Sequence, residues 1–258
     1  MRCQRCGRPT CPQCQRAASV GVHCVDCAKA AQARIRGPRT VAGAKVRGGN
    51  PVVTYALIGL CVVVFLGQMV GQGWVEAYGY FVPVLGERQP WRFLSSAFLH
   101  VGIWHIFLNM YAMYLVGPML EHVLGRARYL TLWILAAIGG SVAVLLLADP
   151  TGPSWLTPVA GASGAVFGMF GALALTMRRM KRSDTQILVI IGINVVLGFV
   201  IPGISWQGHL GGLVVGVALA AAYLFAPKQH RTLVAVAASV GMAVLLVALA
   251  VAKYAGVF

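Results

Sequence analysis

The chain alternates between long apolar segments and short polar ones, and seven of the apolar segments stand out. Each is long enough, or nearly so, to cross the hydrocarbon core of a bilayer, which is about 30 Å thick. They cover residues 52–70, 97–120, 129–148, 159–177, 187–201, 208–225 and 233–251, and the fifth is short and contains glycine. This pattern predicts an all-α polytopic membrane protein.

Composition supports this prediction, and the distribution of charge orients the chain. Apolar residues make up 59% of the sequence, and the mean hydropathy is +0.77. A net charge of +15 would suggest a nucleic-acid partner for a soluble protein. Here, however, eighteen of the 21 lysines and arginines precede the first apolar segment or lie in even-numbered connections. The positive-inside rule therefore predicts a plasma-membrane protein with a cytoplasmic N-terminus, an outer C-terminus, an uncleaved first span and no nucleic-acid partner.

Six cysteines lie within the first 27 residues, in three Cys-x2-Cys pairs. The pairs are Cys3 with Cys6, Cys11 with Cys14, and Cys24 with Cys27, and His23 precedes the last pair. In a reducing cytoplasm this spacing favours tetrahedral zinc over disulfides. Because so short a segment buries little apolar surface, metal would have to stabilise its fold. An unstructured, reduced tail is the alternative.

Ionisable groups within the spans are few, which limits the chemistry. None of the six acidic residues lies in the middle of a span, and no His-Glu-x-x-His motif occurs. These absences exclude the paired aspartates of an intramembrane aspartyl protease and the zinc site of a metalloprotease. A proton-coupled transporter would also usually need a buried carboxylate.

The remaining polar groups converge near the outer ends of three spans. His105 and Asn109 share a face of the second span, Ser163 opens the fourth, and His209 opens the sixth. Ser163 is a candidate nucleophile and His209 a candidate base that accepts its proton. The N–H donors of His105, Asn109 and the Ser163 backbone are candidates for an oxyanion hole. The alternative for Ser163 is a packing role, because small residues let membrane helices approach closely.

Motifs on these same spans resemble those of the rhomboid family of intramembrane serine proteases. They read GASG at residues 161–164, GHLGG at 208–212, and HVGIWHIFLN at 100–109. Supporting matches read PWRFLSSAFLH at residues 90–100 and EHVLGRARY at 121–129, so the resemblance covers about residues 51–225. It implies a six-helix rhomboid core plus one C-terminal transmembrane helix, preceded by a small cytoplasmic zinc-binding module. The expected divisions are a zinc-binding module over 1–28, a basic linker near lipid headgroups over 29–50, the rhomboid core over 51–226, and the additional helix over 227–258.

The resemblance also implies roles for individual residues. Ser163 and His209 would form a catalytic dyad, and His105, Asn109 and the Ser163 amide would stabilise the oxyanion. Gly161 would let the substrate backbone approach.

The resemblance has one departure at Phe167, and it also implies structural roles for three further residues. Phe167 stands where many family members carry tyrosine, so ring packing against His209 is expected without a hydroxyl contact. Trp91 and Arg92 are similar to residues that brace the first outer loop, and Glu121 to one that braces the next cytoplasmic loop.

The N-terminal segment resembles treble-clef or B-box-like zinc modules. That resemblance implies one complete zinc site, formed by Cys3, Cys6, Cys24 and Cys27. Three further candidate ligands then remain, namely Cys11, Cys14 and His23.

The expected function is that of a serine endopeptidase that cleaves transmembrane segments near the outer face. Its partners would be membrane lipids and single-pass membrane-protein substrates, with structural zinc in the N-terminal module and no cofactor for catalysis. A catalytically inactive rhomboid-like protein that binds membrane clients is the alternative, and a channel or transporter is the third class.

Overall fold

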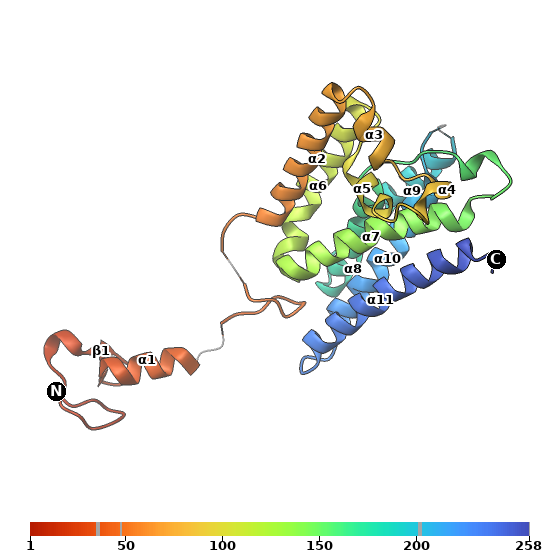
Figure 1. Cartoon of the computed structure of the whole chain (residues 1–258). Helices are drawn as coiled ribbons and strands as arrows, with labels where there is room; N and C mark the ends of the chain where they lie inside the picture. The colour runs from red at the N-terminus through yellow and green to blue at the C-terminus, as the bar shows by residue number, and fades with distance from the viewer. Residues whose placement is uncertain (35–36, 47, 201–202, 258) are drawn as a thin grey trace. The chain divides into compact units, whose positions relative to one another are not determined.

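The structure is a computed structural model that describes residues 1–34, 37–46, 48–200 and 203–257. The chain divides into two compact units, Met1–Pro38 and Arg39–Phe258 (Figure 1). Nearly all of the regular structure is helical, as the apolar pattern predicts.

The first unit is a small hairpin followed by a helix. A 3-10 turn, η1 (Pro12–Cys14), precedes the antiparallel strands β1 (Arg16–Ala17) and β2 (Val22–His23), and α1 (Val25–Arg34) follows. The cysteine pairs therefore lie in tight turns and at a helix start.

The second unit is a helical bundle. Its long helices are α2 (Val52–Val70), α6 (Ile103–Leu124), α7 (Arg126–Leu147), α8 (Ser163–Arg179), α9 (Thr185–Val200), α10 (Trp206–Phe225) and α11 (Arg231–Tyr254). Short elements fill two connections: α3 (Trp74–Gly79), α4 (Pro83–Gly86), α5 (Arg92–Ser95) and η2 (Ser96–Phe98) precede α6, and η3 (Pro153–Trp155) precedes α8.

Among the described residues, five helices are long and apolar enough to cross a membrane: α2, α6, α7, α10 and α11. Each of the seven expected apolar segments contains a helix, but α8 has 17 residues and α9 has 16. Both are shorter than the roughly 20 residues of a full span. The expected end of the fifth segment, at residue 201, lies outside the described residues.

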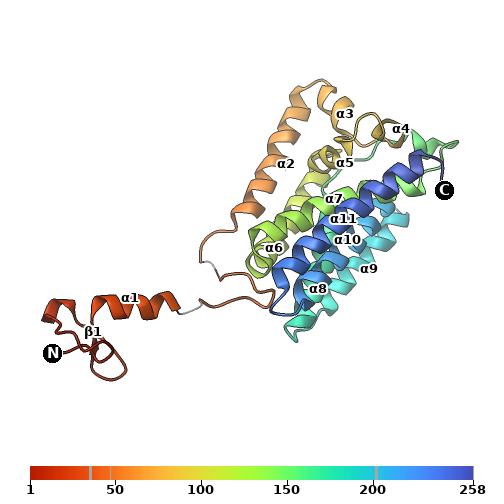
Figure 2. The same cartoon turned by 60° about the horizontal axis from the view of Figure 1, so that its bottom comes forward.

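The short helix α8 lies in the middle of the bundle. Every residue from Gly164 to Ala174 is buried, mainly against α7 and α10. In both views α2 lies along α6, and α11 lies along the outside of α7 and α10 (Figure 1, Figure 2). A helix enclosed by protein need not match the bilayer thickness by itself, which accounts for the short length of α8.

Two expected helix starts came several residues too early, one before a 3-10 turn and the other at a pairing with a distant segment. The segment expected to begin at residue 97 becomes helical only at Ile103, because residues 96–98 form η2. The segment expected to begin at residue 159 becomes helical only at Ser163. There, Val159 pairs with Phe81 as an isolated antiparallel bridge, which holds the backbone extended.

The connection between α2 and α6 is held by the two residues expected to brace it. The Arg92 side chain donates to the carbonyl oxygens of Ala77 and Tyr80, and Trp91 Nε1 donates to the Tyr78 carbonyl at 3.1 Å. Arg92 is 2% exposed, so these bonds stabilise a buried charge. The bracing expectation for this loop is confirmed.

Glu121 holds the opposite end of the bundle. Its carboxylate accepts from the backbone N–H groups of Val53 and Thr54, at 3.1 and 2.8 Å, and from the Thr54 hydroxyl at 2.9 Å. Arg126 adds an ion pair at 3.5 Å. One carboxylate thus joins the start of α2 to the end of α6, in agreement with the bracing role expected for it.

The stretch expected as a linker contains ordered parts. Residues up to Arg34 belong to α1, and Ala42 is buried in the core of the second unit. Thr40 Oγ1 donates to the Val123 carbonyl at 2.6 Å, which attaches this stretch to the end of α6. The boundary between the two compact units, at Pro38, falls within the expected linker.

Candidate active site and candidate metal centre

Ser163 is the first residue of α8, and the chain before it is held by contacts with the α2–α6 connection. Phe81 and Val159 exchange two backbone hydrogen bonds, and the Gly161 N–H donates to the Ser96 carbonyl at 2.9 Å. Because the first N–H groups of a helix lack intrahelical partners, the backbone at Ser163 offers a free donor beside its hydroxyl. The helix dipole adds partial positive charge at the same place.

Gly161 brings the second and fourth expected spans together. Its φ is +130°, a conformation that favours glycine. A Cβ at this position would lie 2.6 Å from His105 Nε2 and 3.7 Å from Ser163 Oγ. The His105 ring and the Ser163 hydroxyl therefore border the same small space, which stays open because Gly161 has no side chain.

His209 comes from α10, which meets α8 backbone to backbone. Ser205 caps α10 by accepting from the Gly208 N–H at 3.3 Å. A Cβ on Gly164 would lie 3.3 Å from the Gly208 carbonyl oxygen, and one on Gly212 would overlap the Gly164 carbonyl. Ser163 and His209 are the chain neighbours of Gly164 and Gly208, so they extend from adjacent points of this contact.

The His209 ring stacks on Phe167. The ring centroids are 4.2 Å apart and the planes differ by 14°, so the expected ring packing is confirmed. His209 Nδ1 is buried and has no hydrogen-bond partner among the described residues. Since no described carboxylate orients this imidazole, ring packing must do so.

The remaining candidates lie on α6 and in the loop before it. Asn109 is buried, and its side-chain amide donates to the His105 carbonyl at 2.9 Å, which uses one of its two N–H groups. His105 packs edge-on against His100, with ring centroids 5.2 Å apart. His100 Nε2 in turn accepts from the Ala162 N–H at 3.5 Å. His100 therefore supports the backbone before Ser163, in keeping with a structural role.

Sequence reasoning missed Gln68 on α2. Its side chain accepts from the His100 N–H at 2.9 Å and donates to the His100 carbonyl at 3.2 Å, so it fixes the backbone of that residue from both sides. A signal was available, because Gln68 is a polar amide inside an otherwise apolar segment.

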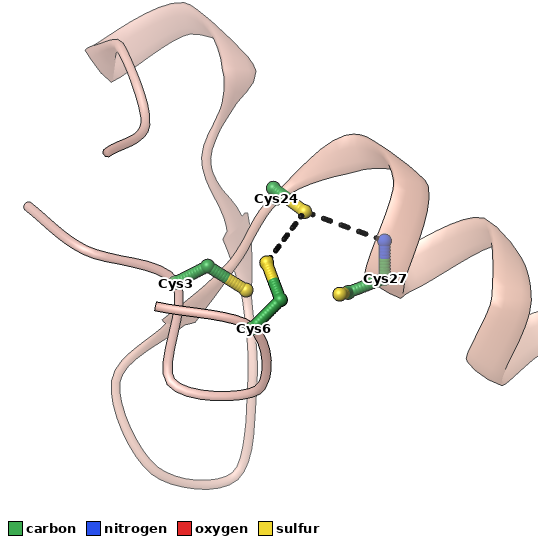
Figure 3. Close-up of side chains that lie close together, drawn as sticks. All are labelled: Cys3, Cys6, Cys24 and Cys27. Atoms are coloured by element: carbon green, nitrogen blue, oxygen red, sulfur yellow. Dashed lines mark hydrogen bonds between the residues drawn. The ribbon is translucent and has the colours of Figure 1, made fainter. Parts of the chain in front are cut away.

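In the first unit, Cys3, Cys6, Cys24 and Cys27 point toward a common centre (Figure 3). Their sulfur atoms all lie within 4.8 Å of one another, and those of Cys6 and Cys24 are 3.7 Å apart. Tetrahedral zinc with Zn–S bonds of about 2.3 Å requires sulfur atoms about 3.8 Å apart. A hydrogen bond from the Cys24 backbone lowers the pKa of Cys3 to about 6, which favours the thiolate that binds metal. This cluster could hold a metal ion.

The other three candidate ligands stay outside this cluster. Cys11 and Cys14 are exposed at the ends of η1, and His23 lies in β2. Among the described residues, Cys3, Cys6, Cys24 and Cys27 form the one group of three or more potential metal ligands whose ligand atoms lie close together.

Comparison with known proteins places the bundle in context. A family model for the rhomboid domain matches residues 87–227. The chain is 36% identical over 224 residues to the rhomboid protease GluP of Bacillus subtilis (strain 168), across 83% of this chain and 42% of that protein. It is 31% identical over 146 residues to the putative rhomboid protease YdcA of the same organism, across 55% of this chain and 70% of that protein. It is 32% identical over 150 residues to RHOMBOID-like protein 5 of Arabidopsis thaliana, across 55% of this chain and 47% of that protein. The chain thus spans less than half the length of two of these three relatives.

Proposed function

The chain belongs to the rhomboid family, and from this premise we propose that it is a serine endopeptidase that cuts other membrane proteins. The observation that carries the proposal is the glycine contact between α8 and α10, which supports a Ser163–His209 pair. Each residue sits beside a glycine whose backbone touches the other helix. The proposal requires the two side chains to come within hydrogen-bonding distance, so that the hydroxyl proton can pass to the imidazole.

In the proposed reaction the Ser163 hydroxyl attacks the scissile carbonyl carbon, and His209 takes up the hydroxyl proton. When the peptide C–N bond breaks, His209 gives that proton to the leaving amine, and the acyl group stays on the Ser163 oxygen. Water then attacks the ester with His209 again as base, which releases the new carboxyl end and restores the serine. Stacking on Phe167 keeps the imidazole in place through both steps.

The oxyanion formed in each step needs donors on one side of the carbonyl. We assign this role to the Ser163 N–H, the His105 ring and the second N–H of Asn109. Gly161 leaves room for the substrate backbone next to His105 and Ser163. A larger residue there would fill the space that the substrate must enter.

The proposed site faces the outside of the cell. Most lysines and arginines lie before α2, in the α6–α7 turn, and after α8 and α10, at the ends opposite Ser163. By the positive-inside rule those ends are cytoplasmic, so Ser163 lies near the outer face and α11 ends outside the plasma membrane. Substrates would be single-pass proteins with small residues near the cut.

The four-cysteine cluster would hold structural zinc in the cytoplasm. Zinc bound there would supply folding energy to a unit with few buried apolar residues. The proposed catalysis needs no cofactor.

The proposal is tested by comparing cells that carry the wild-type chain, Ser163→Ala, or Ser154→Ala. Ser154 is an exposed serine in the loop before α8, which makes it a matched control. Quantitative mass spectrometry of the medium should find membrane-protein fragments that disappear with Ser163→Ala and persist with Ser154→Ala. Fragments unaffected by Ser163→Ala, combined with client proteins whose abundance changes when the chain is deleted, would contradict proteolysis and indicate a client-binding role.

A further inference from the structure

A cavity of about 410 Å³ lies away from Ser163, between α11, α7 and the connection that follows α2. Its walls include Ile138 and Val142 of α7, Leu246 and Ala250 of α11, and Phe93 of α5. This volume falls in the range of ligand-binding pockets, which are mostly apolar with a few polar groups.

The cavity opens on a surface that faces lipid. Val247 and Val251 line it and are 63% and 60% exposed, on the outer side of a helix long and apolar enough to span a membrane. Water is excluded from such a surface in the bilayer, so a hydrocarbon chain is the available material that can fill the space.

Polar groups gather at one end of the cavity. Tyr254 and Glu87 both line it, and the Tyr254 hydroxyl donates to the Pro83 carbonyl at 2.7 Å. Lys253, which precedes Tyr254 in the chain but does not line the cavity, donates from its ammonium to the Leu146 carbonyl at 3.1 Å. Glu87 has no ion-pair partner in the part of the chain that the structure describes. A carboxylate that no described basic side chain pairs with therefore lies at one end of an apolar cavity.

We propose that this cavity binds one phosphatidylethanolamine molecule, with an acyl chain between α7 and α11 and the headgroup ammonium beside Glu87. The apolar walls match the chain, and the negative charge matches a primary ammonium. A phosphatidylglycerol headgroup carries the same phosphate but ends in neutral glycerol, so it has no ammonium to offset the repulsion between that phosphate and the Glu87 carboxylate. The site depends on membrane embedding and is independent of the proposed peptidase activity.

Native mass spectrometry tests the acyl-chain part of the site. The full chain is released from nanodiscs that contain equal amounts of phosphatidylethanolamine and phosphatidylglycerol. The wild-type chain should keep one phosphatidylethanolamine, and Ala250→Trp, which fills the cavity, should keep at least about tenfold less. Ala248→Trp is the matched control, because Ala248 is exposed on the same helix and does not line the cavity. Equal retention by the two tryptophan variants, or retention of phosphatidylglycerol instead, would overturn the proposal.

The headgroup contact is tested by Glu87→Gln against Arg88→Gln, its neighbour outside the cavity lining. An exposed ion pair is worth up to about 1 kcal/mol, so Glu87→Gln should lower the preference for phosphatidylethanolamine by up to about fivefold. Arg88→Gln should leave that preference unchanged, and the reverse pattern would refute the headgroup assignment.

A third measurement needs no variant and holds even if Ala250→Trp fails to fold. Phosphatidylethanolamine with a photoreactive diazirine in its acyl chain is added to the wild-type chain and crosslinked by light. Adducts should map to residues 86–93, 138–142 and 246–255, which together line the cavity, and adducts found only elsewhere would contradict the proposal.

Discussion

Gly212→Ala addresses the helix contact on which the proposed active site depends. A methyl group at position 212 would overlap the carbonyl oxygen of Gly164, and the carbonyl carbon and Cα of Gly164 also lie within 3 Å. These are backbone atoms, so no side chain can rotate away. The only relief is to move α10 away from α8.

The size of the effect follows from ordinary contact distances. Carbon and oxygen atoms in contact lie about 3.3–3.6 Å apart, so the two helices must separate by roughly 1 Å. Overpacking of this kind costs about 1–3 kcal/mol of folding free energy. A displacement of about 1 Å in a catalytic arrangement can lower the rate about 100-fold. We therefore expect a moderate loss of stability and a larger loss of reactivity.

Two measurements on purified protein separate these effects. Thermal unfolding reports stability, and the rate of labelling by a fluorophosphonate probe reports the reactivity of Ser163. Gly241→Ala on α11 is the control, because a methyl group there meets nothing within 4 Å and alanine favours helix by about 1 kcal/mol. If Gly212→Ala unfolds and labels like Gly241→Ala, the close contact of α8 and α10 does not hold the proposed dyad together.

Three further changes probe other parts of the account. Gly161→Ala should reduce fluorophosphonate labelling about 100-fold, because the added methyl group presses on His105 and the backbone conformation is strained for alanine. In the control Gly102→Ala, the methyl group meets nothing within 4 Å, so labelling should be normal. Equal labelling rates for the two variants would contradict the role of Gly161. Glu121→Ala should lower the free energy of unfolding by about 1–3 kcal/mol for each of the two donors of the buried Thr54 that lose their acceptor. Arg126→Gln should cost less than about 1 kcal/mol, because the Arg126 side chain is 47% exposed. Denaturant titration of both variants checks this, and similar losses would show that the ion pair, rather than the capping of α2, matters. Metal analysis of purified protein should find one zinc per chain, lost in Cys24→Ser and kept in Cys11→Ser; zinc that survives Cys24→Ser would exclude the four-cysteine site.

The sequence predicts well what depends on local patterns. The bounds expected for α2 agree with the structure, because its apolar run is closed by Pro51 and Gly71. The bracing roles of Arg92 and Glu121 were anticipated from the resemblance of their motifs to those of the rhomboid family. Cysteine spacing indicated the Cys-x2-Cys pairs, and the resemblance to treble-clef or B-box-like modules anticipated that the first and third pairs come together.

The sequence fails where distant segments act on each other. The late start of α8 depends on the pairing of Val159 with Phe81, and no local pattern reveals that pairing. The hold of Gln68 on His100 likewise joins residues 32 positions apart. The cavity beside α11 was not expected either, because its walls come from three separate parts of the chain.

Mapping a fluorophosphonate adduct on the purified full chain tests the central claim most directly. The account predicts one adduct, on the peptide that contains Ser163, with labelling abolished in Ser163→Ala and sharply reduced in His209→Ala. An adduct on a different serine, or equal labelling of the wild type and both variants, would contradict a Ser163–His209 dyad.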